Sequence, residues 1–315
     1  MDSKSVMIRI GIDPNLALLG PLTLSWHGFF TFVAVALAVY LGARWAREDG
    51  MLRALYLGPV ESLERSIKGM MEQSKVDGAE AERRVAQDIL YSVAVWAIIG
   101  GVVGARLVHV IDRWDFYGPN PFQIIAIWNG GIAIYGAIIG GLAGGALYAY
   151  LKGYSVGALA DLAAPAVLLA MAAGRIGDII NGEHISSYTG MPWGFIYTHP
   201  GSPSYGLAAQ HPAVVYEMIW DMLCFGVVWS MRKRLAPPGM VWVLFLSLYS
   251  FGRFFISFYR EDKLWLAGLT QAHLIAIIFV AFSVPFLMLK AKLVSPSLAT
   301  GSKAAGRGKR SSKKA

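Results

Sequence analysis

Long apolar runs dominate this sequence of 315 residues and constrain its fold more than any other feature. Hydrophobic residues make up 56% of the chain, charged residues only 15%, and the mean hydropathy is +0.50. Because a helix rises about 1.5 Å per residue, about 20 apolar residues cross the roughly 30 Å hydrocarbon core of a bilayer. Runs of this kind cover residues 22–43, 89–111, 124–150, 156–173, 213–231, 241–258 and 266–289. We expect an all-α polytopic membrane protein with about seven transmembrane helices around a lipid-accessible central cavity.

The remaining segments predict the domain organisation and the orientation. Residues 1–289 are expected to form a single transmembrane domain, interrupted by a charged insertion at 44–88 and a polar loop at 174–211. Residues 290–315 are expected to form a basic disordered tail, which accounts for the net charge of +8. Its composition suits anionic lipid head groups and, more weakly, a nucleic-acid arm, and the partners that we expect are membrane lipids and no nucleic acid. Lys and Arg gather in the insertion, the 232–234 connection and the tail. By the positive-inside rule these segments are cytoplasmic, so the N-terminus and the 174–211 loop lie outside.

The most unusual polar stretch follows the charge-free run 162–173. It places Arg175, Asp178, Asn181, Glu183 and His184 within ten positions. Ionisable groups beside hydrocarbon usually face a cavity, a partner or a ligand. Arg175 and Asp178 are three apart, which lets them pair on one helix face. A self-neutralising structural pair and a binding site both remain open at this point.

Further polar side chains are expected near the same outer face. They include His27, Arg106, Tyr135, Arg253 and Arg260. Arginines that converge beside glycine-rich backbone suit a phosphate, because guanidinium groups match phosphate oxygens and stay charged. At a membrane edge this indicates a phospholipid head group. Transporters and channels also collect arginines around anions, so a small anion transporter remains an alternative.

Several common chemistries lack their sequence motifs. The chain has no H-E-x-x-H, no G-x-S-x-G and no P-loop. Its single cysteine, Cys224, lies in an apolar run and reads as a small buried hydrophobe. The six histidines show no metal-ligand spacing. We therefore expect no metal site and no hydrolase of these known motif classes.

Ordered motifs along nearly the whole chain resemble those of the prolipoprotein diacylglyceryl transferases, bacterial inner-membrane enzymes. The stretch Gly174-Arg175-Ile176-Gly177, continued by Asn181-Gly182-Glu183, closely resembles the family signature. Other matching positions are Gly20-Pro21, Trp26, Gly28, Gly104-Ala105-Arg106, Trp128-Asn129-Gly130-Gly131, Gly136, His211-Pro212, Tyr216, Glu217, Tyr249, Arg253 and Arg260.

The resemblance implies a reaction, its partners and a set of site residues. Phosphatidylglycerol would donate its diacylglyceryl group to the lipobox cysteine of a preprolipoprotein signal peptide, releasing glycerol phosphate and requiring no cofactor. It also implies a multi-pass protein of the bacterial plasma (inner) membrane. The catalytic candidates are Arg175, Arg253, Tyr135 and His27. The substrate-binding candidates are Arg175, Asp178, Asn181, Glu183, Gly136, Arg106, Tyr249 and Arg260.

The sequence departs from the best-known members of that family at four positions. His27 stands where those members often have Tyr, Tyr135 where they commonly have His, Asp178 where they have Asn, and Ser257 where they have Glu. A tyrosine with an ordinary pKa near 10 is a poor base at neutral pH. Either Tyr135 positions the substrate, or His27 accepts the thiol proton. The substitutions also leave open a non-catalytic lipid- or lipoprotein-binding relative of the family.

Overall fold

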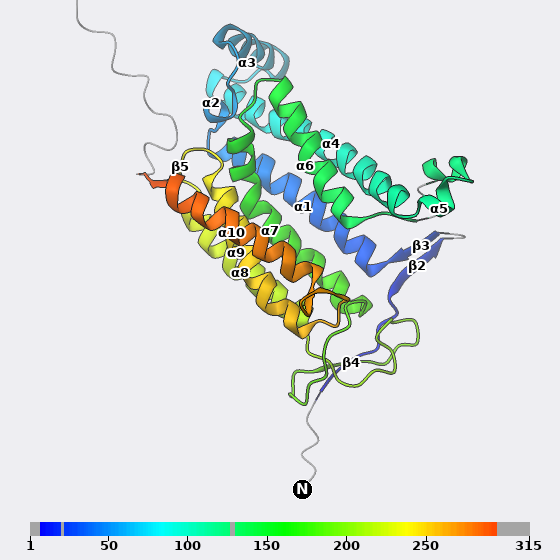
Figure 1. Cartoon of the computed structure of the whole chain (residues 1–315). Coiled ribbons are helices and arrows are strands. Elements are labelled where there is room, and N and C mark those ends of the chain that lie inside the picture. Colours follow the sequence, from blue (N-terminus) through cyan, green and yellow to red (C-terminus); the bar gives the residue numbers. More distant parts are fainter. Residues whose placement is uncertain (1–6, 20–21, 127–129, 295–315) are drawn as a thin grey trace, which may run out of the picture. The chain divides into compact units, whose positions relative to one another are not determined.

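The computed structural model describes residues 7–19, 22–126 and 130–294. Seven of the described helices are long and apolar enough to span a membrane, which confirms the expected all-α polytopic fold. They are α1 (Trp26–Glu48), α4 (Gly78–Asp112), α6 (Ile134–Leu151), α7 (Val156–Asn181), α8 (Ala213–Met231), α9 (Met240–Ile256) and α10 (Gln271–Lys290) (Figure 1).

The helix ends differ from the ends of the apolar runs. Helix α4 begins at Gly78, inside the expected insertion, because a helix can continue in polar sequence beyond the membrane. Helix α7 continues to Asn181, so the expectation that the outer loop starts at residue 174 is wrong. Hydropathy falls at Arg175, but the helix continues because the side chain of Arg175 forms ion pairs with Asp178 and Glu217. Residues 22–25 form strand β3 (Leu22–Ser25) rather than the start of α1.

The chain divides into two compact units. The first contains the described residues up to Leu41 and those from Ala160 onward, and the second contains Gly42–Leu159. The single transmembrane domain expected over residues 1–289 stays a prediction.

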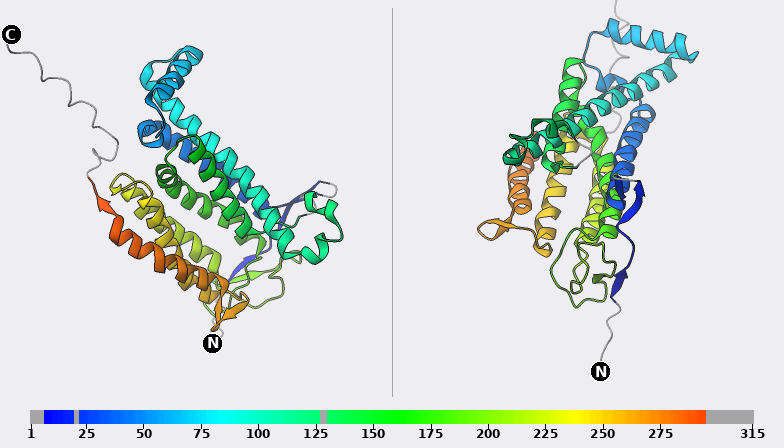
Figure 2. Two further views of the ribbon diagram at one scale, coloured as in Figure 1. Left: turned by 45° about the horizontal axis from the view of Figure 1, so that its top comes forward. Right: turned by 90° about the vertical axis from the view of Figure 1, so that its right-hand side faces the viewer.

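The core of the first unit lies where α7, α8 and α9 meet. Leu168 from α7, Cys224 and Val228 from α8, and Val241 and Phe245 from α9 are buried together. Cys224 is 2% exposed, which confirms its reading as a small buried hydrophobe. Helix α10 packs along α9, and the yellow-to-orange helices run side by side in both views of Figure 2.

An aspartate of α7 caps the start of α9. The carboxylate of Asp161 accepts hydrogen bonds from the backbone N–H groups of Gly239 (2.7 Å) and Trp242 (2.9 Å). These N–H groups have no acceptor within the first turn of their own helix. Asp161 therefore fixes the start of the helix that carries Arg253 toward the other end.

The first unit also contains four pairs of short strands. Strand β1 (Ile8–Ile10) pairs in parallel with β4 (Phe195–Tyr197), and β2 (Asn15–Leu19) pairs antiparallel with β3. The remaining antiparallel pairs are β5 (Leu235–Ala236) with β8 (Lys292–Leu293) and β6 (Leu264–Leu266) with β7 (Leu269–Thr270). The pairing of β8 shows that residues 292–293 are ordered, which corrects the expected start of the disordered tail at 290. The tail from residue 295 onward lies outside the described residues.

The second unit is built on a close contact between α4 and α6. A Cβ on Gly104 would meet the carbonyl oxygen of Gly136, and a Cβ on Gly140 would meet that of Gly100. Only glycine lets the two backbones approach this closely, as in other membrane helix pairs. The unit also contains the shorter helices α2 (Leu52–Leu55), α3 (Val60–Ser74), α5 (Trp114–Tyr117) and the 3-10 helix η1 (Pro121–Ile125).

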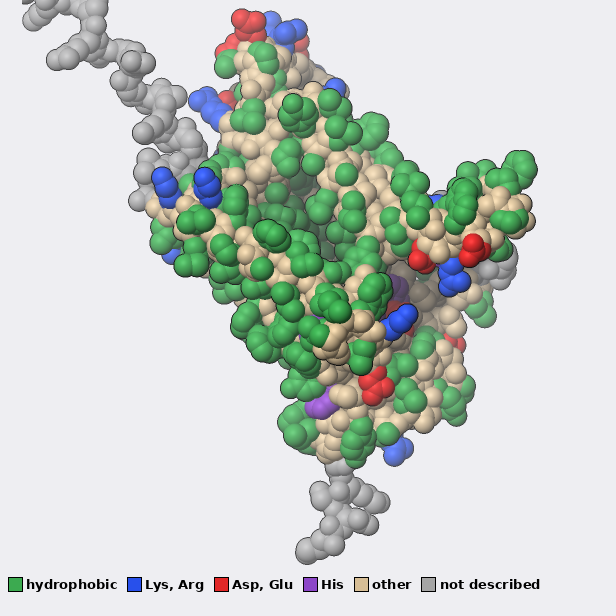
Figure 3. Space-filling view, viewed as in Figure 1, with side chains coloured by type: hydrophobic (Ala, Val, Ile, Leu, Met, Phe, Trp, Pro, Cys, Tyr) green, Lys and Arg blue, Asp and Glu red, His purple; other side chains and the backbone are tan. Residues whose placement is uncertain are grey.

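Figure 3 shows hydrophobic side chains over the helix surfaces, with most charged side chains toward the helix ends. Apolar residues such as Val103, Leu142 and Phe282 are more than half exposed. A surface of this kind suits contact with lipid tails. The helix ends then lie near the two membrane–water interfaces.

Candidate active site

The start of α1 and the end of α7 lie in close contact. A Cβ on Gly177 would lie 2.8 Å from the Cα atom of His27, so glycine is needed there. The side chain of Asn181 accepts a hydrogen bond (3.3 Å) from the backbone N–H of His27, one of the first N–H groups of α1. This contact places the imidazole of His27 beside the last turn of α7.

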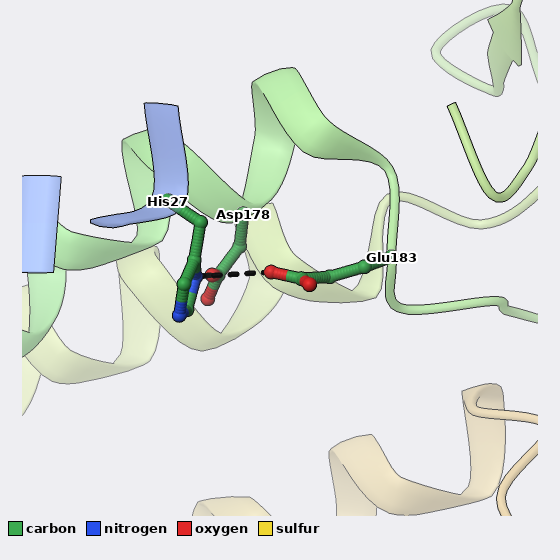
Figure 4. A group of neighbouring side chains, drawn as sticks. All are labelled: His27, Asp178 and Glu183. Carbon is green, nitrogen blue, oxygen red and sulfur yellow. Dashed lines mark hydrogen bonds and ion pairs between the residues drawn. The ribbon is translucent and has the colours of Figure 1, made fainter. Parts of the chain in front are cut away.

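His27 is held between two carboxylates. Its Nδ1 atom lies 2.6 Å from Oδ1 of Asp178 and 2.9 Å from Oε1 of Glu183 (Figure 4). Both neighbours are acceptors, so Nδ1 carries a proton, and in the neutral ring the lone pair lies on Nε2. The side chain of His27 is 46% exposed, whereas that of Asp178 is 8% exposed. An oriented histidine with an accessible second nitrogen has the arrangement of a general base.

A second feature of the site is one buried carboxylate that binds three arginines. Glu217 of α8 is 3% exposed and contacts Nη1 of Arg175 at 2.6 Å and Nη1 of Arg260 at 3.4 Å. It also pairs with Nη1 of Arg253 from α9. The three guanidinium groups are 6% to 19% exposed. Burial makes these contacts strong and makes the loss of any partner expensive.

The ion pairs close into a ring that also contains Asp178 and His184. Arg260 donates from Nη2 to Nδ1 of His184 (2.9 Å), because an arginine only donates. The proton of the neutral His184 ring is then on Nε2, which lies 3.5 Å from Oδ2 of Asp178. Asp178 contacts Arg175 at 3.5 Å, which confirms the pairing expected from their spacing. We call Asp178, Arg175, Glu217, Arg260 and His184 the ionic ring.

The ring and Arg253 bring three guanidinium groups together around Glu217. Three buried guanidinium groups face two buried carboxylates, those of Glu217 and Asp178. Asp262 is a further partner of Arg260 at 3.0 Å, but its side chain is 39% exposed. A site of this composition suits an anion, and guanidinium groups suit phosphate in particular.

The loop after α7 covers the end of that helix. The hydroxyl of Tyr197 donates to the carbonyl of Ile179 (2.8 Å), that of Ser202 to Asn181 (2.9 Å) and that of Ser204 to Gly182 (2.6 Å). Burial, and to a lesser extent the Asp178 carboxylate, raises the pKa of Tyr197, which keeps its hydroxyl protonated as a donor. The loop thereby satisfies carbonyls that have no partner in the helix.

The other predicted residues of the first unit have structural contacts. Tyr249 packs against the core beside Phe245, one turn before Arg253 on α9. Ser257 is buried, and its hydroxyl donates to the carbonyl of Arg253 (2.6 Å). The resemblance leads one to expect a glutamate at position 257. The shorter serine that stands there binds the backbone of its own helix instead.

Three predicted residues, Arg106, Tyr135 and Gly136, lie in the second unit. Arg106 donates to the backbone carbonyls of Gln123, Ile124, Ala126, Gly130 and Gly131. This pattern favours a role in holding the loop before α6 over binding a phosphate. Gly136 lies against Gly104, which favours helix packing. Tyr135 stands in the first turn of α6 and is 40% exposed.

Sequence reasoning missed two parts of this site. The sequence indicates Glu217 as an orienting or pairing group at the start of its apolar run, but it does not identify the three arginines that this carboxylate contacts. The grouping of His27, Asp178 and Glu183 is not visible in the sequence either, because His27 lies about 150 residues from the two carboxylates and has no metal-ligand spacing to another His or Cys. Their ligand atoms lie within 4.8 Å of one another, a set that could hold a cation.

Comparison with known proteins gives one consistent family. The family profile "Prolipoprotein diacylglyceryl transferase" matches residues 67–289. Phosphatidylglycerol–prolipoprotein diacylglyceryl transferases of Synechococcus elongatus and Dehalococcoides mccartyi are 30% and 31% identical to this chain, over 86% and 90% of its length. These matches cover 85% and 96% of the two relatives. The relative from Gloeobacter violaceus is 37% identical over 62% of this chain and 75% of its own length. With these similarities and its seven membrane-spanning helices, the chain belongs to the prolipoprotein diacylglyceryl transferase family.

Proposed function

We propose that this protein transfers the diacylglyceryl group of phosphatidylglycerol to the lipobox cysteine of preprolipoproteins. The observation that carries the proposal is the ionic ring with Arg253, three buried guanidinium groups around Glu217, next to the histidine held by Asp178. The relatives that carry this activity in their names support the choice of donor and acceptor.

In the proposed reaction, the cysteine sulfur attacks the glyceryl carbon that bears the phosphate. A thioether C–S bond forms, the C–O bond breaks, and glycerol phosphate leaves with the electron pair. Arg175 and Arg253 neutralise the charge on the departing phosphate without any proton transfer. Nε2 of His27 takes the thiol proton, and Asp178 and Glu183 stabilise the resulting imidazolium. Asn181 holds the start of α1 and so fixes the position of the base.

The membrane arrangement completes the proposal. The protein lies in the bacterial inner membrane with its N-terminus and the ionic ring on the outer side and its C-terminus in the cytoplasm. The distribution of Lys and Arg among the connections supports this orientation. A lipobox peptide, at the outer end of a signal-peptide helix, would then reach the ring from within the membrane.

Replacing Arg175 by alanine should lower the transfer rate about a hundredfold to a thousandfold, because a charged contact to the leaving group is lost. Purified protein is given phosphatidylglycerol labelled in the diacylglyceryl group and a lipobox peptide, and labelled peptide is quantified. Arg113→Ala, at an exposed arginine after α4, is the matched control and should be unchanged. If the wild type binds phosphatidylglycerol but transfers nothing, the protein is a non-catalytic lipid-binding relative of the family and the proposed enzyme activity is wrong.

Comparing His27→Gln with Tyr135→Phe identifies the proton acceptor. We expect His27→Gln to reduce kcat about a hundredfold or more, since glutamine retains the shape but has no basic nitrogen. Tyr135→Phe should retain most of the activity. Single-turnover rates at saturating phosphatidylglycerol separate this effect from binding. The reverse pattern, with only the tyrosine variant inactive, would assign the proton to Tyr135 instead.

A further inference from the structure

Helix α8 carries a second buried carboxylate, Asp221, which the proposed reaction does not use. Asp221 is 1% exposed and follows Glu217 by four residues, so both side chains lie on the same face of the helix. Cys224 and Val228 continue that face and are buried in the core with α7 and α9. Asp221 therefore lies about one helical turn from Glu217, between the ionic ring and the core.

The arginine cluster, which consists of Arg175, Arg253 and Arg260, interacts with Asp221 through Arg175. The guanidinium group of Arg175 contacts Glu217 at 2.6 Å, and its positive charge also acts on the carboxylate of Asp221. This interaction joins Asp221 to the site through space. The charged and titratable groups on the three packed helices are Arg175 of α7, Glu217 and Cys224 of α8, and Tyr249 and Arg253 of α9.

Asp221 differs in its contacts from the two carboxylates of the ionic ring. Glu217 contacts three guanidinium groups, and Asp178 is paired with Arg175 and His27. No hydrogen-bond donor within residues 7–19, 22–126 and 130–294 reaches the Oδ2 atom of Asp221. A buried carboxylate that lacks hydrogen bonds is costly in its charged form. Of the three buried carboxylates, Asp221 is therefore the one that accepts a proton most readily.

With Asp221 ionised, the buried charges of the site are balanced. Three guanidinium groups that are 6% to 19% exposed lie with three carboxylates that are 1% to 8% exposed. His27, Glu183 and Asp262 are 35% to 46% exposed, so water compensates their charges. A phosphate diester adds one negative charge, and an uncompensated charge away from water is unfavourable. A proton on Asp221 restores the balance.

We infer that Asp221 balances the charge of the arginine cluster by taking up a proton when the phosphate of an anionic lipid binds to the arginines. The inference rests on the proposed function for the identity of that ligand. It adds a residue that acts through Arg175 and does not touch the lipid. Because the complex holds one more proton than the free protein, the affinity for the lipid should fall as the pH rises, by up to about tenfold per pH unit.

Calorimetry measures this proton uptake directly on the wild type. The purified protein is titrated with dihexanoyl phosphatidylglycerol, without an acceptor peptide, in buffers that differ in their enthalpy of ionisation. We expect uptake of about half a proton to one proton per lipid between about pH 7 and 8. Dihexanoylglycerol, which has the same acyl chains but no phosphate, is the control ligand and should bind without proton uptake.

Replacing Asp221 by asparagine removes the group that takes up the proton but keeps its shape. Proton uptake should fall to near zero, and the loss of affinity between about pH 6 and 9 should be at least about tenfold smaller than in the wild type. Asp221→Leu is a second neutral variant, because an apolar side chain of similar volume is often tolerated in place of a buried charge. Asp112→Asn, at an exposed position of α4, is the matched control and should behave as the wild type. Thermal unfolding checks that each variant is folded.

The outcomes separate this inference from the proposed function. Proton uptake that the wild type shows and the neutral variants lose supports the role of Asp221, even if the protein transfers nothing. Unchanged uptake in a folded neutral variant assigns the proton to another group and overturns the inference. A wild type that binds the anionic lipid without proton uptake, or that does not bind it, also overturns the inference. Absence of transfer from labelled phosphatidylglycerol to the lipobox peptide refutes the proposed function alone.

Discussion

Replacing Glu217 by glutamine is expected to reduce transfer by at least about a thousandfold, the largest effect of any single change in the site. Glutamine keeps the shape of the side chain but removes the charge that Arg175, Arg253 and Arg260 share. Breaking a buried ion pair costs about 3 to 5 kcal/mol, because the remaining buried charge is no longer fully compensated. The three guanidinium groups would then repel one another and lose their positions.

The measurement is the transfer assay together with thermal unfolding of the purified protein in detergent. Glu48→Gln is the matched control, since Glu48 pairs with Arg44 at an exposed site. Exposed pairs contribute about 0 to 1 kcal/mol, so this variant should be close to the wild type in both measurements. An activity of Glu217→Gln within about tenfold of the wild type would contradict the role of Glu217 as the common partner of the arginines.

Replacing Gly104 by leucine is expected to separate α4 from α6 and to lower the free energy of unfolding by about 1 to 3 kcal/mol or more. A Cβ on Gly104 would meet the carbonyl oxygen of Gly136 and lie 2.8 Å from the Cα atom of Gly140. Backbone atoms cannot rotate away as a side chain can, so the helices themselves must move.

Unfolding of the purified protein with increasing SDS measures this loss. Gly226→Leu serves as the control, because no described atom outside its own helix neighbourhood lies within 4 Å of a Cβ built there. That variant should unfold at the wild-type SDS concentration. If the two leucine variants were equally stable, the close contact between α4 and α6 at Gly104 would not contribute to the stability of the protein.

The membrane spans were predictable because hydropathy is a local property. Each of the seven apolar runs overlaps one of the seven helices, and the run 213–231 coincides with α8. The ends were less predictable where polar residues stay helical. Asp178 and Asn181 belong to the last turns of α7, since their side chains bind His27 and the start of α1. Nothing in a window of hydropathy distinguishes such residues from a loop.

The site was predictable as a collection of residues but not as an arrangement. The spacing of Arg175 and Asp178 predicted their pairing, because both lie on one helix. The contacts of Glu217 join α7, α8, α9 and the segment after α9. The sequence pattern within one helix does not predict contacts between residues that are far apart in the chain. Arg106 shows the opposite case, in which charge suggested a ligand but backbone carbonyls bind the guanidinium.

Two of the departures from the best-known family members turned out to be neighbours. His27 and Asp178 are far apart in the sequence, whereas Nδ1 of His27 and Oδ1 of Asp178 lie 2.6 Å apart in the structure. A histidine and an aspartate at these positions form a charge-assisted pair that either residue alone would not form.

The hydroxyl groups of Tyr197, Ser202 and Ser204 tie the loop after α7 to the end of that helix. Each hydrogen bond of this kind is worth about 1 kcal/mol, so lifting the loop forfeits about 3 kcal/mol and exposes the last carbonyls of the helix. Lifting this loop away from the helix would therefore loosen the same end of α7 that carries Asp178 and Asn181. For the proposed reaction, a lipid donor that arrives sideways from the bilayer would avoid this penalty, and His27 would keep its position while donors and products exchange.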